Sequence, residues 1–177
     1  MILLQFRINL GMTVSQNAQL SPKEYVLKCK KAASQGNVIA QNTLGYLYLN
    51  GQGVKQNYKE AAVWFRKAAE QEYRESQYNL SIMYKLGQGV ELDRSEGFKW
   101  LKKAAEYGHA GAQNSLGDLF YQGEDVDQDY IAAYSWWLLA EQNDFNDIAH
   151  KKIELKKKMT GADILQAEQL AMQHGKH

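Results

Sequence analysis

A glycine motif that occurs three times comes nearest to a ligand-binding signature in this chain. The copies are Gly51-Gln52-Gly53-Val54, Gly87-Gln88-Gly89-Val90 and the altered Gly123-Glu124-Asp125-Val126. Glycine-rich loops hold phosphate groups when they follow a strand and open a helix with a longer glycine pattern. Here the glycines follow helical segments, so the motif predicts a turn in which Asp125 can adopt the left-handed conformation.

Metal binding and nucleophilic catalysis find little support among the remaining side chains. The four histidines are scattered and match no zinc-binding spacing: His109, His150, His174 and His177. The single cysteine, Cys29, aligns with Phe65, Leu101 and Trp137 in the repeats described below, so we expect a buried structural thiol. A nucleophilic cysteine would need an adjacent base and partial exposure. We therefore predict no catalytic residue, no metal and no cofactor.

Three tryptophans could stack on a carbohydrate, and a group of lysines could bind an anion. Trp64, Trp100 and Trp136 recur every 36 residues, which favours a place in the repeat core over a ligand site. The lysines predict a solvated helix face, with an anionic-partner site as the alternative. They are Lys151, Lys152, Lys156, Lys157 and Lys158. The formal net charge of +1 argues against nucleic-acid binding.

The interval of 36 residues extends over most of the chain and defines equivalent positions, which have the same place in successive copies. Leu44, Leu80 and Leu116 keep this interval and are predicted to lie with the tryptophans in the core. Repetition at this length predicts helix pairs that stack along one axis. The expected fold is therefore all-α, a right-handed α/α solenoid of stacked antiparallel helix pairs.

The ends of the expected helices recur as well. A capping residue precedes the first helix of each pair, and the first three caps stand three residues before a glutamate, as in a capping box. The caps are Ser21, Asn57, Asp93 and Asp129. The break after the first helix contains glycine in two copies, but Glu72 and Asp144 replace it in the others. We expect Glu72 either to bend differently or to accept a left-handed backbone.

The recurring residues together resemble the Sel-one-like repeat (SLR) family, a relative of tetratricopeptide repeats. The matching pattern is Ala-Gln, Leu-Gly, Tyr, Gly-x-Gly-Val, a small residue, Trp and then Lys-Ala-Ala. The resemblance covers residues 21 to about 158, with full repeats at 37–72, 73–108 and 109–144 and a half-repeat at each end. It implies an α/α superhelix and adaptor roles, some of them in bacterial secretion, envelope biology or immunity against toxins.

Some cysteine-rich relatives in that family are linked to β-lactam binding or hydrolysis. Their paired cysteines are absent here, because Cys29 is the single cysteine. An enzyme of this kind is therefore kept only as an alternative to a noncatalytic scaffold.

The expected organisation has three parts. Residues 1–20 form an N-terminal extension, residues 21–159 the solenoid, and residues 160–177 a capping helix with a tail. The apolar start is interrupted by Gln5, Arg7 and Asn9 and makes a poor signal peptide, although Met12 is an alternative start. We expect a monomer in the cytoplasm, with a periplasmic or secreted protein as the alternative, and no membrane insertion.

A partner surface is expected where exposed positions vary between copies, because recurring positions build the scaffold. On the second helix of each pair these positions should line the concave face and hold a protein or peptide. The predicted partner-binding residues are Asn42, Tyr46, Tyr78, Asn79, Ile82, Asn114 and Asp118. The predicted function is a noncatalytic protein-interaction scaffold or adaptor.

Overall fold

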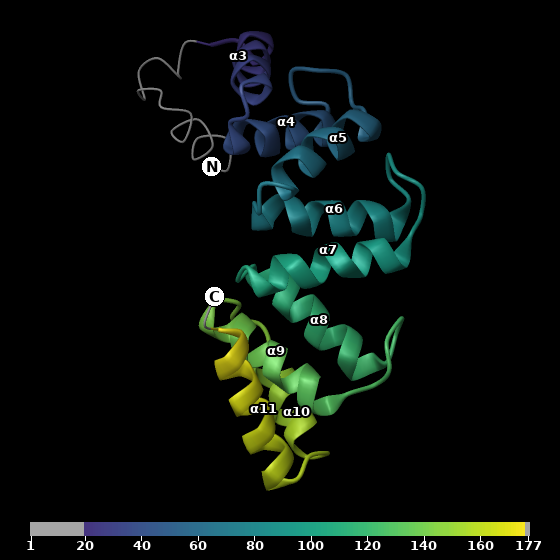
Figure 1. Cartoon of the computed structure of the whole chain (residues 1–177), viewed down its shortest axis with the longest axis vertical. Coiled ribbons are helices and arrows are strands. Elements are labelled where there is room, and N and C mark those ends of the chain that lie inside the picture. The colour runs from purple at the N-terminus through teal and green to yellow at the C-terminus, as the bar shows by residue number, and fades with distance from the viewer. Residues whose placement is uncertain (1–19, 176–177) are drawn as a thin grey trace. The chain divides into compact units, whose positions relative to one another are not determined.

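The computed structural model describes residues 20–175, and the secondary structure in this range is entirely helical, as predicted (Figure 1). The predicted N-terminal extension lies outside the described residues except for Leu20. The chain divides into two compact units, Met1–Asp93 and Arg94–His177. Each unit has its own hydrophobic clusters.

The first unit contains two helix pairs. They are α3 (Pro22–Ser34) with α4 (Val38–Asn50), and α5 (Tyr58–Ala69) with α6 (Arg74–Leu86). Each helix packs on the next one in the chain. Tyr25, Cys29 and Leu44 belong to one buried cluster, and Phe65 and Met83 belong to the other. Cys29 is fully buried, which confirms the expected structural thiol.

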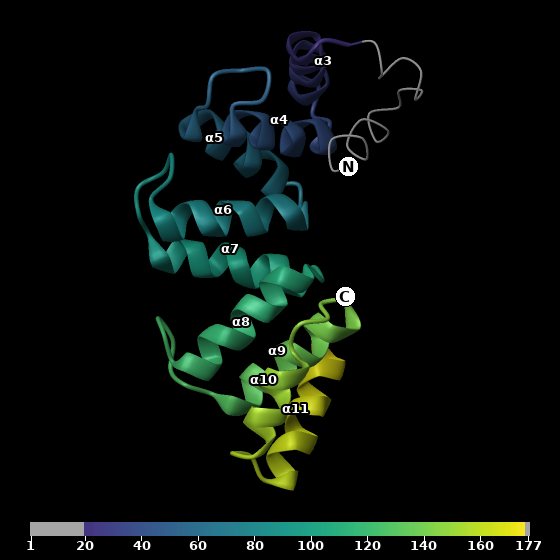
Figure 2. The same cartoon turned by 180° about the vertical axis from the view of Figure 1, so that it is seen from behind.

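The second unit contains a helix pair, a further pair and a final helix. The helices are α7 (Arg94–Glu106), α8 (Ala110–Gln122), α9 (Tyr130–Gln142), α10 (Ala149–Lys156) and α11 (Gly161–His174). The core is built around Tyr134 and Trp137 of α9 with Ile148 and Leu155 from the region of α10. Helix α11 runs beside α9 in both views (Figure 1, Figure 2).

The glycine turns form as predicted, and of the three predicted capping boxes the first is complete, whereas Asn57 accepts hydrogen bonds from the Lys59 and Glu60 amides without a complete box. Ser21 and Glu24 form a capping box at the start of α3, and Asp129 accepts hydrogen bonds from two amides at the start of α9. Gly51, Gly87 and Gly123 end the second helices with left-handed φ angles of 68°, 65° and 71°. The glycine motif is therefore a helix-ending turn.

The second glycine of this motif is required by close packing in two copies. A Cβ atom on Gly89 would lie 2.1 Å from the carbonyl oxygen of Tyr58, and one on Gly53 would lie 2.6 Å from that of Pro22. The third copy has Asp125 at φ 62°, and its carboxylate pairs with Arg94 at 3.1 Å. Arg94 stands at the position equivalent to Pro22 and Tyr58. The change from glycine to aspartate is thus accompanied by a cation that binds the new side chain.

The break that lacks glycine after α5 accepts a left-handed residue rather than bending differently. Glu72 has a φ of 64°, and Asp144 at the equivalent position has a φ of 66°. A left-handed conformation in a residue with a Cβ costs about 1 kcal/mol. The chain therefore keeps the geometry of the break even where the sequence does not favour it.

The predicted core residues are buried with one exception. Leu44, Leu80 and Leu116 are fully buried, and Trp100 and Trp136 are 9% and 4% exposed. Trp64 is only half-buried, which corrects the prediction of equal burial for the three tryptophans. Its ring packs on the edge of the first cluster, and the Lys67 ammonium lies 4.4 Å from the ring centroid. A cation above the ring can stabilise this exposed face.

Candidate functional site

The seven residues predicted to bind a partner lie on three second helices. Asn42 and Tyr46 are on α4, and Asn114 and Asp118 are on α8. The remaining three are on α6: Tyr78, Asn79 and Ile82. Because α8 belongs to the second unit, its residues form a separate group.

Asn42 is not exposed, which corrects the sequence prediction. Its side chain is fully buried, and its Oδ1 accepts a hydrogen bond of 2.8 Å from the Ser76 hydroxyl. Ser76 lies on α6, so this hydrogen bond joins the two second helices. The equivalent residues Tyr78 and Asn114 are only partly buried. The side chains at this position of the repeat therefore differ in their exposure to solvent from one copy to the next.

Tyr46 joins α4 to α6 through a hydrogen-bonded network. Its hydroxyl donates to Oε1 of Glu75 and accepts from Nδ2 of Asn79, both at 2.7 Å. Its ring meets the Phe65 ring edge to face, with centroids 5.2 Å apart. Burial raises the pKa of Tyr46 well above its usual range, and the Glu75 carboxylate adds to this rise. Tyr46 and Asn79 thus connect adjacent copies of the repeat.

Asp118 holds an equivalent network in the second unit. Lys151 Nζ donates to Oδ1 and Oδ2 of Asp118 at 2.7 and 2.9 Å and to Oδ1 of Asn114 at 3.2 Å. The Trp137 indole donates to Oδ1 of Asp118 at 3.2 Å. The predicted residues Asn114 and Asp118 are therefore already bound by the chain's own α10.

The two networks occupy the same positions of the repeat. Asp118 stands two repeats after Tyr46, and Lys151 stands two repeats after Asn79. Helix α10 therefore packs as the second helix of an incomplete fourth repeat. This contact was not predicted, and Lys151 was assigned to a solvated face, although steps of 36 residues align it with Asn79.

The other lysines of the basic stretch also have partners within the chain. Lys152 pairs with Glu141, and Lys157 pairs with Glu154 at 2.6 Å. Lys158 donates to the Tyr121 hydroxyl at 3.1 Å, and this hydrogen bond raises the pKa of Lys158. Lys156 Nζ lies 5.4 Å from the ring centroid of Tyr134. Each of these lysines thus interacts with a residue of the same chain, which weakens the alternative that the lysines bind an anionic partner.

Among the residues predicted to bind a partner, Tyr78 and Ile82 are two large side chains with apolar surface that solvent can partly reach. Both are half-buried and stand four residues apart, so they lie on one face of α6. Their equivalents are polar or differ in size: Asn42 and Asn114 for Tyr78, and Tyr46 and Asp118 for Ile82. This face of α6 thus differs from the corresponding faces of α4 and α8.

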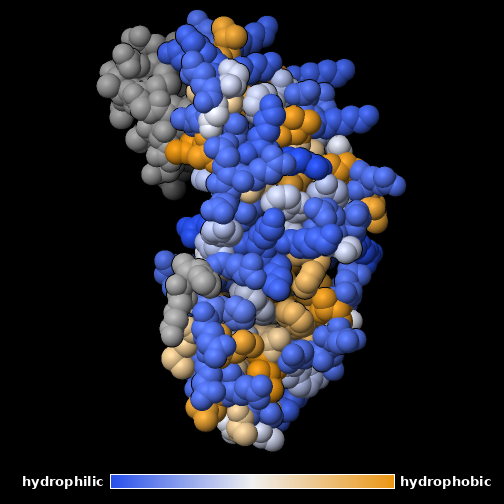
Figure 3. Space-filling model, viewed as in Figure 1, coloured by the Kyte–Doolittle hydropathy of each residue, from blue (hydrophilic) through white to orange (hydrophobic). Residues whose placement is uncertain are grey.

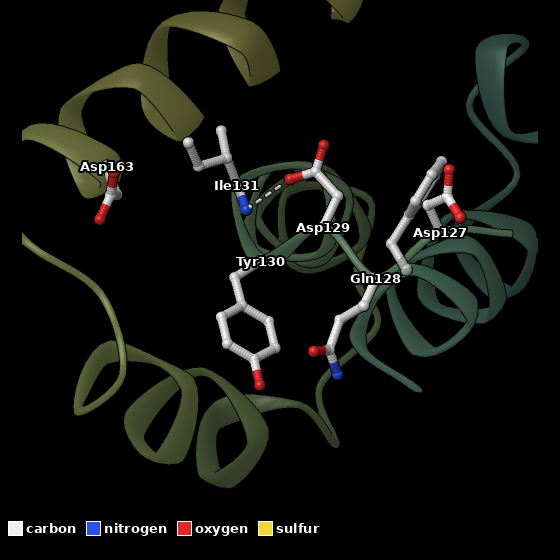
Figure 4. A pocket seen from close by; sticks show the side chains of 7 residues that line it. Asp127, Gln128, Asp129, Tyr130, Ile131 and Asp163 are labelled. Atoms are coloured by element: carbon white, nitrogen blue, oxygen red, sulfur yellow. Dashed lines mark hydrogen bonds between the residues drawn. The ribbon is translucent and has the colours of Figure 1, made fainter. Parts of the chain in front are cut away.

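An acidic cavity of about 570 Å³ lies in the second unit between the turn before α9 and the start of α11 (Figure 4). It is lined by Phe120, Asp127, Gln128, Asp129, Tyr130, Ile131 and Asp163. Asp129 caps α9, and Asp163 completes the capping box that Thr160 begins at α11, so both carboxylates accept amide hydrogen bonds at helix starts. These carboxylates therefore have a structural role.

Neither a metal site nor a membrane-spanning helix is found in residues 20–175. This range has no cluster of three or more His, Cys, Asp or Glu side chains suited to a metal ion. None of its helices has both the length and the apolar character needed to cross a bilayer.

Comparisons with known proteins identify the repeat. The family model described as Sel1 repeat matches residues 38–73, 74–109 and 110–145. A Sel1 repeat protein from Oxalobacter formigenes is 36% identical, with a TM-score of 0.64 over 71% of this chain and 52% of that one. The protective antigen c5321 of uropathogenic Escherichia coli strains, which has an SLR fold, is 30% identical, with a TM-score of 0.61 over 87% of this chain and 41% of that one.

This chain thus spans about half or less of those two solved proteins. A comparison with curated proteins gave no match. The repeat matches, the helix pairs and the glycine turns agree with one another, and the chain belongs to the Sel1 repeat family.

Proposed function

We propose that this chain is a noncatalytic scaffold that binds a protein or peptide through the face of α6 that carries Tyr78 and Ile82. Sel1 repeat proteins generally act as scaffolds for protein interactions and are generally noncatalytic. In this chain the partner surface is assigned to one helix, α6.

The observation that carries this proposal is the difference between α6 and its equivalent helices. At the positions of Tyr78 and Ile82, the first unit presents a half-buried aromatic and an aliphatic side chain. At the same positions α8 has Asn114 and Asp118, whose side chains bind Lys151. Aromatic and aliphatic side chains that become buried on binding supply much of the energy of many interfaces.

Purification of the tagged protein from its native host tests this assignment. The wild type is compared with the double variant Tyr78→Ala, Ile82→Asp and with a control that changes exposed apolar residues on α3 and α5, Leu27→Ala, Val63→Asp. Mass spectrometry then identifies the proteins that co-purify, and circular dichroism verifies that each variant is folded. We expect a near-stoichiometric partner with the wild type and the control that is lost from the α6 variant.

Retention of that partner by a folded Tyr78→Ala, Ile82→Asp variant would contradict the α6 surface. Turnover of a β-lactam that is abolished by a single substitution would instead support the enzyme alternative. Affinity for polyanions that falls steeply with salt would support binding through the lysines.

A further inference from the structure

Two leucines near the end of α6 are exposed to an unusual degree. Leu86, the last residue of α6, is 55% exposed, and Leu92, in the loop that follows, is 58% exposed. The backbone that follows Leu86 lies beside Leu92, because a Cβ atom on Gly87 would be only 3.2 Å from Cβ of Leu92. We refer to Leu86 and Leu92 as the leucine pair. In Figure 3, small apolar areas interrupt a mostly hydrophilic face, one of them over the loop that follows α6 in Figure 1.

In the full repeats before and after, polar residues stand at the positions of both leucines. The equivalents of Leu86 are Asn50 and Gln122, and those of Leu92 are Gln56 and Gln128. The two glutamines have the same structural role: Gln56 Nε2 donates to the Leu49 carbonyl and Gln128 Nε2 to the Tyr121 carbonyl, each at 2.8 Å. Leucine cannot donate this hydrogen bond.

The middle copy therefore lacks a stabilising hydrogen bond and exposes hydrocarbon instead. Exposed apolar side chains gain nothing from water, and apolar side chains that gather on a surface are a feature of interaction sites. Because the other two copies show which residues serve the fold at these positions, the leucines point to a role outside the fold.

The charges beside the leucine pair indicate the chemistry of its partner. Lys85 precedes Leu86, Glu91 precedes Leu92, and both charged residues are exposed. Within residues 20–175, neither Lys85 nor Glu91 forms an ion pair with another side chain. A partner can therefore supply an acidic residue to Lys85 and a basic residue to Glu91 without breaking a bond of the free protein.

The small area of the patch decides between a second copy and a peptide. A stable dimer buries roughly 800 Å² on each partner, far more than two partly exposed leucines offer. A short peptide can instead be anchored by one or two apolar side chains and positioned by flanking charges.

We propose that the leucine pair binds a short peptide segment of another protein, in which an apolar residue stands between an acidic and a basic one. This inference rests on the scaffold function proposed above and adds a second contact surface of defined chemistry. It places a specificity-determining site on the loop after α6.

The first test uses the substitutions that the other copies suggest, Leu86→Asn, Leu92→Gln. If the leucines serve binding, this variant keeps or raises the thermal midpoint of unfolding, because Leu92→Gln can restore the hydrogen bond made by Gln56 and Gln128. A clear fall in the midpoint would show that the leucines stabilise the fold and would overturn the proposal.

The second test measures binding with a library of random twelve-residue peptides displayed on phage. Peptides selected on the wild type are synthesised, and their affinities for three proteins are compared: the wild type, Leu86→Asn, Leu92→Gln, and the control Leu165→Asn, Met172→Gln. The control changes two residues of α11 that are 57% and 60% exposed. We expect at least a ten-fold loss of affinity for the leucine-pair variant alone, and amide chemical-shift changes in residues 85–93.

Other outcomes separate this inference from the proposed scaffold function. Peptides that depend on Tyr78 and Ile82 but not on the leucine pair would overturn the inference and leave the scaffold function in place. Selection of no specific peptide on the wild type would count against both. A dimer in sedimentation experiments that Leu86→Asn, Leu92→Gln dissociates would replace the peptide with a second copy.

Discussion

The Tyr46 hydroxyl and the Asp118 carboxylate show how one position of the repeat can serve the same role with different chemistry. Tyr46 is linked to Asn79 by a neutral hydrogen bond, whereas Asp118 is linked to Lys151 by an ion pair. Both contacts join one second helix to the next. A substitution at either position should therefore affect stability before it affects binding.

Replacement of Tyr46 by phenylalanine should reveal the contribution of its hydroxyl. Loss of the hydrogen bonds to Glu75 and Asn79 should lower the free energy of unfolding near neutral pH by about 1 to 2 kcal/mol, because these half-buried side chains each lose a bonded partner. Urea unfolding of wild type and Tyr46→Phe measures this difference. Equal stability of the two proteins would show that water replaces the hydroxyl.

The pH dependence of that difference has a defined sign. The folded state raises the pKa of Tyr46 above the value of 10.0 for a free tyrosine, so folding favours the protonated hydroxyl. The stabilisation is complete below pH 10 and decreases as the pH rises further, since the unfolded state releases its proton first. Between pH 10 and 11 the wild type should therefore lose stability faster than Tyr46→Phe, which a parallel urea titration at each pH would detect.

The ion pair between Asp118 and Lys151 should make a small, salt-dependent contribution. Their side chains are 33% and 38% exposed, so we expect a coupling of about 0.5 to 1 kcal/mol in a double-mutant cycle with Asp118→Asn and Lys151→Met. The coupling should weaken in concentrated salt. A cycle without coupling would mean that α10 is held by its apolar residues alone.

At the scale of the helix, a glycine in α4 and another in α8 let the following helices, α5 and α9, approach closely. A Cβ atom on Gly45 would lie 2.5 Å from the Phe65 ring, and one on Gly117 would lie 2.3 Å from the Trp137 ring. The middle copy has Ser81 at the glycine position and Leu101 at the position of the aromatic residues. The two positions thus vary together: glycine occurs with an aromatic residue, and the larger serine occurs with the smaller leucine.

This covariation predicts compensation between the two positions. Gly45→Ser alone should destabilise the protein by about 1 to 3 kcal/mol through overpacking against Phe65. The combination Gly45→Ser, Phe65→Leu copies the middle repeat and should be more stable than the sum of the single changes predicts. Thermal or urea unfolding of the four proteins provides the comparison, and simple additivity would contradict direct packing between the positions.

At the scale of the whole molecule, the end of the array is closed by a helix that departs from the repeat. Helix α11 packs on α9, and the ring of His174 stacks on Trp136 with centroids 4.7 Å apart. Ser135 of α9 is fully buried, whereas the equivalent residues Leu27 and Val63 are 69% and 46% exposed. The last helix thus covers a face that remains exposed on α3 and α5, as expected of a terminal cap.

Deletion of the chain from Thr160 onward should therefore destabilise the protein. Trp136 and Leu139 are 4% and 2% exposed in the intact chain, and the deletion would expose them to water. Full exposure of a buried apolar side chain lowers the free energy of unfolding by about 1.5 to 3 kcal/mol. Thermal unfolding and a red shift of tryptophan fluorescence would report the change. Thr160→Ala is the control, since loss of the cap alone should cost only about 1 kcal/mol. Unchanged stability after deletion would mean that α11 is not a cap.

The features predicted correctly from the sequence are those set by local interactions and by the period. Ser21 and Asp129 cap helices through bonds to amides only two or three residues away, and Gly51 ends a helix through its own backbone freedom. Leu44 and its equivalents recur at a fixed interval, so their burial follows once the helix pairs stack. Helix caps and repeated core positions can be predicted from the sequence without knowing which helices pack together.

The tertiary structure decided what each exposed position contacts. Asn42 is buried and accepts a hydrogen bond from Ser76 of α6, and Trp64 is half-exposed although its equivalents are buried. Lys151 leaves the expected solvated face because Asp118 and Asn114 lie across from it on another helix. These outcomes depend on side chains that are 33 to 37 residues apart in sequence, and helical periodicity carries no information about partners at such separations.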